Sequence, residues 1–448
     1  MAGRLIPHRD AAAPKPQALR HAIVIGAGIA GLTAARALAR HMDRVTLIET
    51  DRLGSGAEPR RRVPQAGHVH ALLDAGRQAL EALFPGLEET AQEQGAVLLP
   101  VRSRWRSHDG HDWSAPQDTG PKVLSQSRPA LEALLRARVR ALPGLVLQEG
   151  RVEGLVAGTC PPGHAPRITG VRLSGGARIA ADLVIDATGR AGRGADWLAA
   201  AGFDRPPETR SAPRVRYAST LFTRADRLPS AWLKLASPPQ TRGAVLAPIE
   251  GGRWIFTLTD RFGAAMPGDE AGLRAAILAL GDGRIAALLS SERLLAPIRH
   301  FHIDTVRLRG FDSCPPPSGF LPLGDAIATY NPLHAQGMTA AILQASALEE
   351  ALAGDARDAM TLRERYLPRA MGIARAAWRI GLAMDLTWPQ FSGPADPQAE
   401  ALARSLRAAF AASLLRPQLC PPIDRLLHLN DLELAPELHS GLRPPALS

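Results

Sequence analysis

The chain is poor in cysteine, and its cysteines do not form a pattern. Cys160, Cys314 and Cys420 are odd in number and far apart. This excludes a disulfide framework of the kind that holds small secreted domains together, and it excludes a cysteine-based metal knuckle. We therefore expect a protein of a reducing compartment, with the cytoplasm as the default location.

Lysine is almost absent as well: Lys15, Lys122 and Lys234 are the only ones. The net charge of +10 is carried almost wholly by arginine. The arginines are scattered, and the longest basic run is Arg60–Arg62. Such a skew is more simply explained by coding bias than by a nucleic-acid surface, so no nucleic-acid partner is expected.

Long hydrophobic runs are also missing. No window approaches the ~18 apolar residues that a membrane-spanning helix needs, so no transmembrane segment is expected. Residues 1–20 are rich in Ala, Pro and charged residues and lack an apolar core, which is typical of a flexible leader rather than a signal peptide. Peripheral contact with a membrane stays open.

What the chain does contain is a nucleotide-binding pattern near its start. The apolar run His21–Ile25 predicts a buried parallel strand, an amphipathic helical pattern follows, and Val45–Ile48 predicts a second strand that ends at Glu49. In that helix Thr33 falls on the side opposite the apolar residues. Three glycines in G-x-G-x-x-G spacing connect the first strand to the helix: Gly26, Gly28 and Gly31.

Each part of this pattern has a physical role. Gly26 allows a tight turn, Gly28 leaves room for a pyrophosphate, and Gly31 lets the helix lie close to the strand. The helix N-terminus offers free N–H groups to phosphates. Glu49 can accept hydrogen bonds from ribose hydroxyls and would repel a 2′-phosphate, which favours FAD or NAD over NADP.

Further strands and helices are predicted along the chain. Leu183–Ile185 and Gly319–Leu323 are buried strands, and Gly243–Thr259 is a hairpin whose Trp254 and Phe256 are assigned to the sheet core. A helix is expected over Ala271–Leu289. Strands of one parallel sheet thus come from three distant segments, with an antiparallel section between the second and third.

The predicted fold class is therefore α/β. A Rossmann-like nucleotide-binding domain is built from discontinuous segments, a mainly antiparallel β-sheet domain is inserted in it, and a helical region ends the chain. The expected boundaries are 21–75, 125–200 and 300–352 for the nucleotide-binding domain, 76–124 and 201–299 for the inserted substrate domain, and 353–448 for the C-terminal region.

The motifs and their order resemble a known family. GAGIAG with Glu49, and GFLPLGDAIATYNPLHAQGMTAA after the last strand, are similar to the two FAD motifs of the flavoprotein monooxygenases of the p-hydroxybenzoate hydroxylase type. VPQAGHVHALL, SRPALEALL and ADLVIDATGR resemble in outline a narrower branch related to polyether epoxidases and squalene epoxidase. The resemblance covers roughly residues 20 to 350 and implies FAD, electrons from NAD(P)H and O₂.

The resemblance also assigns residues to the cofactor. Asp325, after Gly324, is expected to accept a hydrogen bond from a ribityl hydroxyl. The N–H groups at the start of the following helix are expected to stabilise negative charge on the flavin ring. Arg128 is expected near the FAD phosphates or ribityl chain, and Gln65 near the ring. The N–H groups expected to stabilise charge on the flavin ring belong to the first residues of the helix after Asp325: Gln336, Gly337 and Met338.

The chain departs from the family at two places. Its second fingerprint has Thr188-Gly189 where the family usually has Asp-Gly, a pair linked to FAD and NAD(P)H contact. Either NAD(P)H therefore docks transiently over the flavin, or a partner flavin reductase supplies the electrons, and the missing carboxylate favours the reductase. The family's Gly-Gln-Gly beside the flavin is Ala335-Gln336-Gly337, which gives the backbone less freedom.

Candidates for catalysis are fewer, since the flavin carries the difficult chemistry. His68 is expected to pass the flavin ring, and Tyr330 and His334 flank the flavin loop and are expected to face the substrate. His68-x-His70 has the spacing of a zinc site, but no further Cys or His stands at ligand spacing, so no metal is expected.

The predicted function is hydroxylation or epoxidation of a small apolar, secondary-metabolite-like substrate through a flavin C4a-hydroperoxide. Three alternatives remain. A flavin-dependent halogenase would want a W-x-W-x-I-P motif, which the tryptophans here do not form. A prenyl-chain reductase of similar architecture would work without O₂. A non-catalytic FAD-binding protein would hold an inert flavin.

Overall fold

The computed structural model describes residues 19–60, 63–108, 112–158, 166–226, 229–354 and 358–433. The leader expected over residues 1–20 lies almost wholly outside the described residues, as do Arg61, Arg62 and Cys160.

A five-stranded parallel sheet forms the base of the molecule. Its strand order is β18-β10-β1-β2-β6, and every neighbouring pair is parallel. The strands are β1 (His21–Ile25), β2 (Arg44–Glu49), β6 (Leu145–Glu149), β10 (Leu183–Asp186) and β18 (Phe320–Pro322). The sheet predicted from distant segments is thus confirmed. The centres of its interior strands, such as Ala22–Val24 and Leu183–Ile185, are apolar and fully buried.

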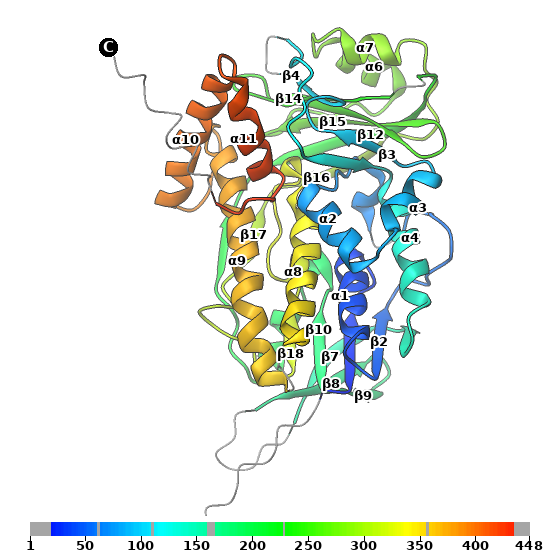
Figure 1. Cartoon of the computed structure of the whole chain (residues 1–448), viewed down its shortest axis with the longest axis vertical. Coiled ribbons are helices and arrows are strands. Elements are labelled where there is room, and N and C mark those ends of the chain that lie inside the picture. Colours follow the sequence, from blue (N-terminus) through cyan, green and yellow to red (C-terminus); the bar gives the residue numbers. More distant parts are fainter. Residues whose placement is uncertain are drawn as a thin grey trace, which may run out of the picture.

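Helices run side by side along one face of this sheet (Figure 1). α1 (Ile29–Ala39) packs against the strands and against α8 (Gln336–Ala353), and α9 (Ala359–Asp385) packs on the other side of α8. Because α8 covers α1, the helix has no solvent face at Thr33. The expectation of an outward Thr33 is therefore wrong: the residue is fully buried, and its hydroxyl donates to the Ile29 carbonyl at 2.8 Å.

A six-stranded sheet lies above the parallel one (Figure 1). Its order is β16-β12-β15-β14-β13-β4, and all pairs are antiparallel except β13 with β4. The strands are β4 (Trp105–His108), β12 (Val215–Thr223), β13 (Ala231–Lys234), β14 (Arg242–Ile249), β15 (Arg253–Arg261) and β16 (Arg299–Ile303).

One face of this sheet is a hydrophobic core and the other looks toward the parallel sheet. Trp254 and Phe256 belong to the core, as predicted, and pack with α6 (Glu270–Leu278) and α7 (Arg284–Leu289). The single helix expected over Ala271–Leu289 is wrong. Gly281 and Gly283 adopt φ of +71° and +67°, and this left-handed backbone breaks the helix in two.

Shorter elements connect these layers. The helices are α2 (Asp74–Leu83), α3 (Leu87–Glu93), α4 (Arg128–Arg140) and α5 (Gly194–Ala200). The strands are β3 (Val97–Pro100) with β5 (Lys122–Ser125), β7 (Val152–Ala157) with β8 (Ile168–Leu173) and β9 (Arg178–Ala180), and β11 (Glu208–Ser211) with β17 (Val306–Arg309). Ser127 caps α4, because its side chain accepts from the Ala130 N–H.

The C-terminal region is helical, as predicted, and its helices pack on one another. α10 (Pro397–Ser413) packs on α9, and α11 (Cys420–Leu427) packs on α10. The Arg102 guanidinium donates to both oxygens of Asp424 at 2.6 and 3.0 Å, which joins α11 to the loop before β4. Across the described ranges, no helix combines the length and the apolar character needed to cross a bilayer.

Candidate active site

The glycines between β1 and α1 adopt the geometry that the sequence predicts. Gly26 has φ +101°, and a β-carbon there would lie 2.5 Å from the Ala187 carbonyl oxygen. A β-carbon on Gly31 would lie 1.7 Å from the Gly26 oxygen. A β-carbon on Gly28, in contrast, would meet no atom within 4 Å, although Gly28 borders a large cavity. Gly28 thus leaves open the space that a pyrophosphate at the N-terminus of α1 would fill.

Glu49 lies beside this turn, at the end of β2. Its Oε2 accepts from the Ala27 N–H at 2.8 Å and from Arg60 at 2.5 Å, while its Oε1 accepts from the Thr50 N–H at 2.7 Å. Burial acts to raise the pKa of Glu49, but Arg60 and the backbone donors outweigh it and lower that pKa. An ionised Glu49 can accept further hydrogen bonds from hydroxyl groups, and Arg60 holds its carboxylate in place.

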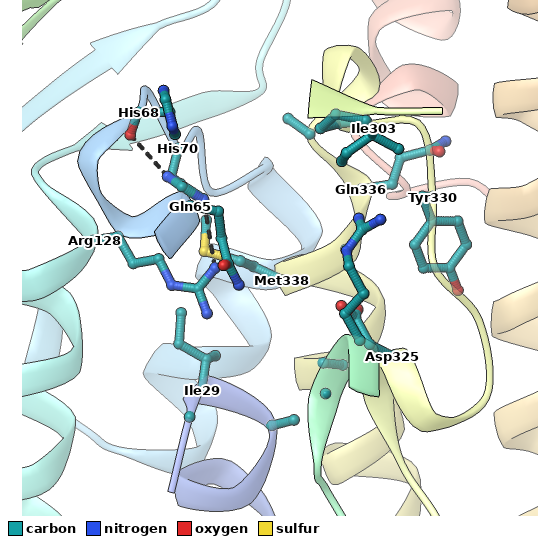
Figure 2. A pocket seen from close by; sticks show the side chains of 18 of the residues that line it. Ile29, Gln65, His68, His70, Arg128, Ile303, Asp325, Tyr330, Gln336 and Met338 are labelled. Carbon is teal, nitrogen blue, oxygen red and sulfur yellow. Dashed lines mark hydrogen bonds between the residues drawn. The ribbon is translucent and has the colours of Figure 1, made fainter. Parts of the chain in front are cut away.

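The first cavity has a volume of about 1090 Å³ including its open mouth, and it runs from Gly28 toward the antiparallel sheet. Figure 2 shows its two sides: Gln65, His70, Arg128 and Met338 lie on one side of an open space, and Asp325 and Gln336 lie on the other. Every cofactor candidate except Gly26, Gly31, Glu49 and Gly324 lines this cavity. The structure therefore brings together segments that are more than 250 residues apart in the sequence.

Asp325 supplies a carboxylate to the first cavity without a protein partner. Among the described residues no group donates a hydrogen bond to it, and burial raises its pKa against the opposing charges of Arg190, Arg128 and Arg307. Gly324 does not reach the cavity, and its N–H donates to the Gln344 side chain at 2.7 Å. An open carboxylate beside a glycine-bordered cradle fits the hydroxyl-rich linker of FAD.

The N-terminus of α8 closes the far end of the first cavity. The helix begins at Gln336, so the N–H groups of Gln336, Gly337 and Met338 have no acceptor within the helix. Ala335 precedes it with φ +55°, a left-handed conformation that favours glycine. Alanine thus adopts here a left-handed backbone that costs it more free energy than it would cost glycine, and Gln336, Gly337 and Met338 still line the first cavity.

Arg128 and His70 form the opposite wall. Arg128 Nε donates to Glu132 at 2.9 Å, and its Nη1 lies 3.4 Å from Nε2 of His70. His70 Nδ1–H donates to the His68 carbonyl at 2.8 Å. Burial first and the Arg128 charge second lower the pKa of His70 to about 3, so this imidazole is neutral.

His68 is buried between two aromatic rings and two hydroxyls. Its ring centroid lies 5.6 Å from Tyr217 and 5.4 Å from Phe301. Nδ1 lies 2.7 Å from the Ser219 hydroxyl, which lies 2.7 Å from the Thr257 hydroxyl. Burial lowers the pKa of His68 to about 4, and Nε2 has no partner in the described part of the chain.

A second cavity of about 930 Å³ adjoins the first. It lies between the inward face of the antiparallel sheet, the loop before α8 and the end of α9. Both cavities are lined by Val69, Ala71, Tyr217, Pro332 and Ala335, so they share a wall. Of the two catalytic candidates in the flavin loop, Tyr330 lines only the first cavity and His334 only the second.

Two residues of the second cavity's polar corner were not identified from the sequence. Asp385, the last residue of α9, accepts at Oδ1 from Arg261 Nη2 at 2.9 Å and from Asn331 Nδ2 at 2.7 Å, and this oxygen lies 3.1 Å from His334 Nε2. Arg261 belongs to the row of β15 side chains that faces the second cavity, on the other face of the strand from Trp254 and Phe256. This arginine could have been recognised from the sequence as a sign of a polar site, because a charged residue in a buried row needs a partner of opposite charge.

No group of three or more His, Cys, Asp or Glu side chains able to hold a metal ion occurs among the residues that the structure describes.

Comparisons with known proteins agree with this geometry. Residues 21–145 match the family described as FAD dependent oxidoreductase. Protein Rv3254 of Mycobacterium tuberculosis is 34% identical over 348 residues, which cover 74% of this chain and 73% of that protein.

Among solved structures, PqsL, a probable FAD-dependent monooxygenase from Pseudomonas aeruginosa, aligns with a TM-score of 0.62 and 21% identity over 83% of this chain and 97% of its own. The flavin-dependent brominase Bmp2 aligns with a TM-score of 0.64 and 14% identity over 94% of this chain and 98% of its own. These likenesses show the fold: a Rossmann-like core with added antiparallel sheets and C-terminal helices, as predicted.

Proposed function

Because the chain is an FAD-dependent oxidoreductase and belongs to the family of protein Rv3254, we propose that it is a monooxygenase that inserts one oxygen atom of O₂ into a small, largely apolar substrate. The observation that carries the proposal is the shared wall between the two cavities. A cofactor in the first cavity would meet a substrate in the second across Tyr217, Pro332 and Ala335.

The chain's own residues would bind the cofactor along the first cavity. Gly28 and the N-terminus of α1 would hold the pyrophosphate, Glu49 the adenosine ribose, and Asp325 a ribityl hydroxyl. Gln65 and Arg128 would border the opposite side, and the first N–H groups of α8 would face the ring. Reduced flavin, when bound there, supplies the activation of O₂.

The second cavity would select and orient the substrate. Its walls include Trp105, Leu233, Val245, Met384 and Trp388, side chains that exclude water and favour an apolar ligand. His68 stays neutral at the wall of the first cavity, where the row His68–Ser219–Thr257 connects to the second cavity at Thr257. We assign the substrate domain to residues 76–124 and 201–299 on this basis.

Electrons would come from NAD(P)H. We propose that a partner flavin reductase delivers them, since Thr188 replaces the acid of the second fingerprint and its hydroxyl is held by Asp186. The chain contains no second G-x-G-x-x-G that would build a separate nicotinamide site.

Isotope labelling tests the proposed function. The purified flavoprotein, NADH or NADPH and a flavin reductase are supplied with ¹⁸O₂ and a panel of apolar aromatic and polyene compounds. One ¹⁸O atom per product molecule supports a monooxygenase, and an epoxide rather than an alcohol would place the chain nearer the polyether and squalene epoxidases. Product that forms only when bromide or chloride is added would indicate a halogenase, and saturated product without O₂ would indicate a reductase. A flavin that is never reduced would indicate a non-catalytic protein.

A further inference from the structure

The polar corner of the second cavity joins three elements at one carboxylate oxygen. Oδ1 of Asp385, at the end of α9, is 2.9 Å from Arg261 Nη2 of β15, 2.7 Å from Asn331 Nδ2 and 3.1 Å from His334 Nε2 of the loop before α8. The Asp385 and Arg261 side chains are each 3% exposed, and His334 is 15% exposed. Asp385 is thus deeply buried, while His334 keeps some access to the cavity.

The ionised Asp385 favours the His334 tautomer with its hydrogen on Nε2, because Oδ1 lies 3.1 Å from Nε2, closer than the Asn331 Nδ2 donor at 3.3 Å. Burial acts to raise the pKa of Asp385, but His334, Arg261 and Asn331 outweigh it and lower that pKa. An ionised carboxylate can only accept, so Nε2 of His334 carries the hydrogen that points to Asp385. In the neutral ring the lone pair is then on Nδ1, and the carboxylate stabilises the imidazolium that forms if Nδ1 takes a proton.

Nδ1 of His334 is the free end of this pair. Within the described ranges it has no hydrogen-bond partner, and it is not among the buried polar atoms that lack one, so it is accessible. His334 lines the second cavity, next to Ala335, which lines both cavities. A base at this position reaches a ligand in the second cavity at the side that borders the first.

Arg261 provides a second indication of a polar ligand. It lines the second cavity, its guanidinium stacks 4.8 Å from the Trp388 ring, and its buried Nε–H has no acceptor among the described residues. A wholly apolar ligand would leave this buried donor unsatisfied, which disfavours the binding of such a ligand. A ligand oxygen near Arg261 and His334 would satisfy it.

We propose that His334 is a catalytic base that removes the proton of an acidic hydroxyl on the substrate, with Asp385 as its positioning residue. The inference rests on the proposed function and narrows its substrate to a largely apolar molecule that carries a phenolic or enolic hydroxyl. The O–H bond breaks, its electron pair stays on oxygen, and the proton bonds to Nδ1. The resulting oxyanion donates electron density to the neighbouring carbon atoms of the substrate. One of these electron-rich carbons is the atom that an electrophilic oxygen atom attacks.

Every charged or titratable group that borders this corner acts on the same equilibrium. Arg261 of β15 and Lys234 of β13 line the second cavity as cations, and Tyr217 of β12 lines it as a neutral phenol because burial raises its pKa. Lys234 is already bound through its ammonium to the Leu280 carbonyl. The cations favour an oxyanion electrostatically, but among the described residues that line the second cavity only His334 can accept the proton.

Coloured phenols test the proposal on the holoenzyme without turnover. 4-Nitrophenol and 4-nitro-1-naphthol are titrated into the oxidised flavoprotein over a pH series, and the nitrophenolate band is read by difference absorption against the flavin. We expect the bound probe to ionise at least about one pH unit below the free probe, which corresponds to a tenfold preference for the oxyanion. Asp385→Asn should remove most of that shift, and His334→Gln all of it.

Matched variants separate this role from a structural one. Glu350→Gln makes the same acid-to-amide change at an exposed pair with Arg369 and should leave the shift unchanged. FAD content and melting temperature show that each variant is folded; if Asp385→Asn does not fold, His334→Gln alone decides, because its site is a partly exposed loop.

Different results would overturn the proposed function and the role of His334. Absence of ¹⁸O in any product overturns the proposed function whatever the phenols do. Probes that bind only as neutral phenols, probes that do not bind at all, or an ionisation shift that survives in both Asp385→Asn and His334→Gln overturn the inference, and the last result would assign the shift to Arg261 and Lys234.

Discussion

The hydroxyl of Thr188 donates a hydrogen bond of 2.7 Å to Oδ1 of Asp186, the last residue of β10. The same oxygen accepts from the Thr188 N–H at 3.0 Å, and the other oxygen accepts from the Gly194 N–H at 3.1 Å. Asp186 is 1% exposed, and burial raises its pKa. The side chain at position 188 is thus used to fix the turn after β10, and it presents no free carboxylate to an incoming nicotinamide.

The first prediction concerns flavin reduction. Anaerobic stopped-flow mixing of the oxidised enzyme with NADH or NADPH, with and without substrate, should give slow bleaching, and a flavin reductase should accelerate it. Thr188→Asp restores the acid of the family's fingerprint and should speed direct reduction if its carboxylate is the missing contact. Bleaching at catalytically useful rates by NAD(P)H alone in the unmodified enzyme would refute the reductase proposal.

The second prediction concerns the phosphate cradle. Gly28→Val should abolish FAD binding, because its side chain would occupy the open space that borders the first cavity. Gly372→Val is the matched control: it also meets no atom within 4 Å, but it lies on the exposed side of α9. Flavin absorbance after gel filtration is the measurement, and a Gly28→Val protein that remains fully yellow would exclude this site.

A third prediction separates FAD from FMN at Glu49. Glu49→Ala should weaken FAD by about ten- to a hundredfold, or ~1.5–3 kcal/mol, because charge-assisted hydrogen bonds to the adenosine ribose are lost. FMN lacks that ribose and should bind nearly as before. Glu149→Ala, at the paired and exposed position of β6, is the control. Equal losses for both flavins in a fluorescence titration would place the Glu49 carboxylate outside the cofactor site.

The fourth prediction is a pH dependence of stability. The pKa of His68 falls from 6.5 to about 4 on folding, so the unfolded chain binds the extra proton first, and stability is lost as the pH falls from 6.5 toward 4. Between about pH 6.5 and 5, the free energy of unfolding should fall by about 1–2 kcal/mol more in the unmodified protein than in His68→Asn. Urea unfolding at both pH values measures it, with the exposed His302→Asn as control. Parallel pH profiles for the unmodified protein and the His68 variant would refute the assignment.

The sequence predicted the turn between β1 and α1 and the strands around it because their constraints are local. Gly26, Gly28 and Gly31 stand in one turn, and the strand before them and Glu49 after them lie within thirty residues. Asp325 is equally local, since it follows directly on a buried strand. These positions need particular residue types for geometric reasons, so they can be recognised without any knowledge of what packs around them.

The sequence did not predict what depends on distant packing. Thr33 is polar but buried, because α8 covers a side of α1 that the helical pattern alone assigns to solvent. Asp385 lies 51 residues beyond His334 in a region without a motif, so only the folded chain brings the two together. Likewise, the basic residue Arg60 belongs to the Glu49 carboxylate rather than to an outer surface.

The common wall of the two cavities has an evolutionary consequence. Among the described residues, only Val69, Ala71, Tyr217, Pro332 and Ala335 border both spaces, and the remaining walls of the second cavity come from the antiparallel sheet, the loop before α8 and the end of α9. If the second cavity holds the substrate as proposed, mutations in those outer walls change which molecule is accepted without altering a residue that borders the first cavity. Paralogues could therefore diversify in substrate range through substitutions at positions such as Leu233, Val245 and Met384. The same positions are suitable for a mutant library in directed evolution toward a new substrate.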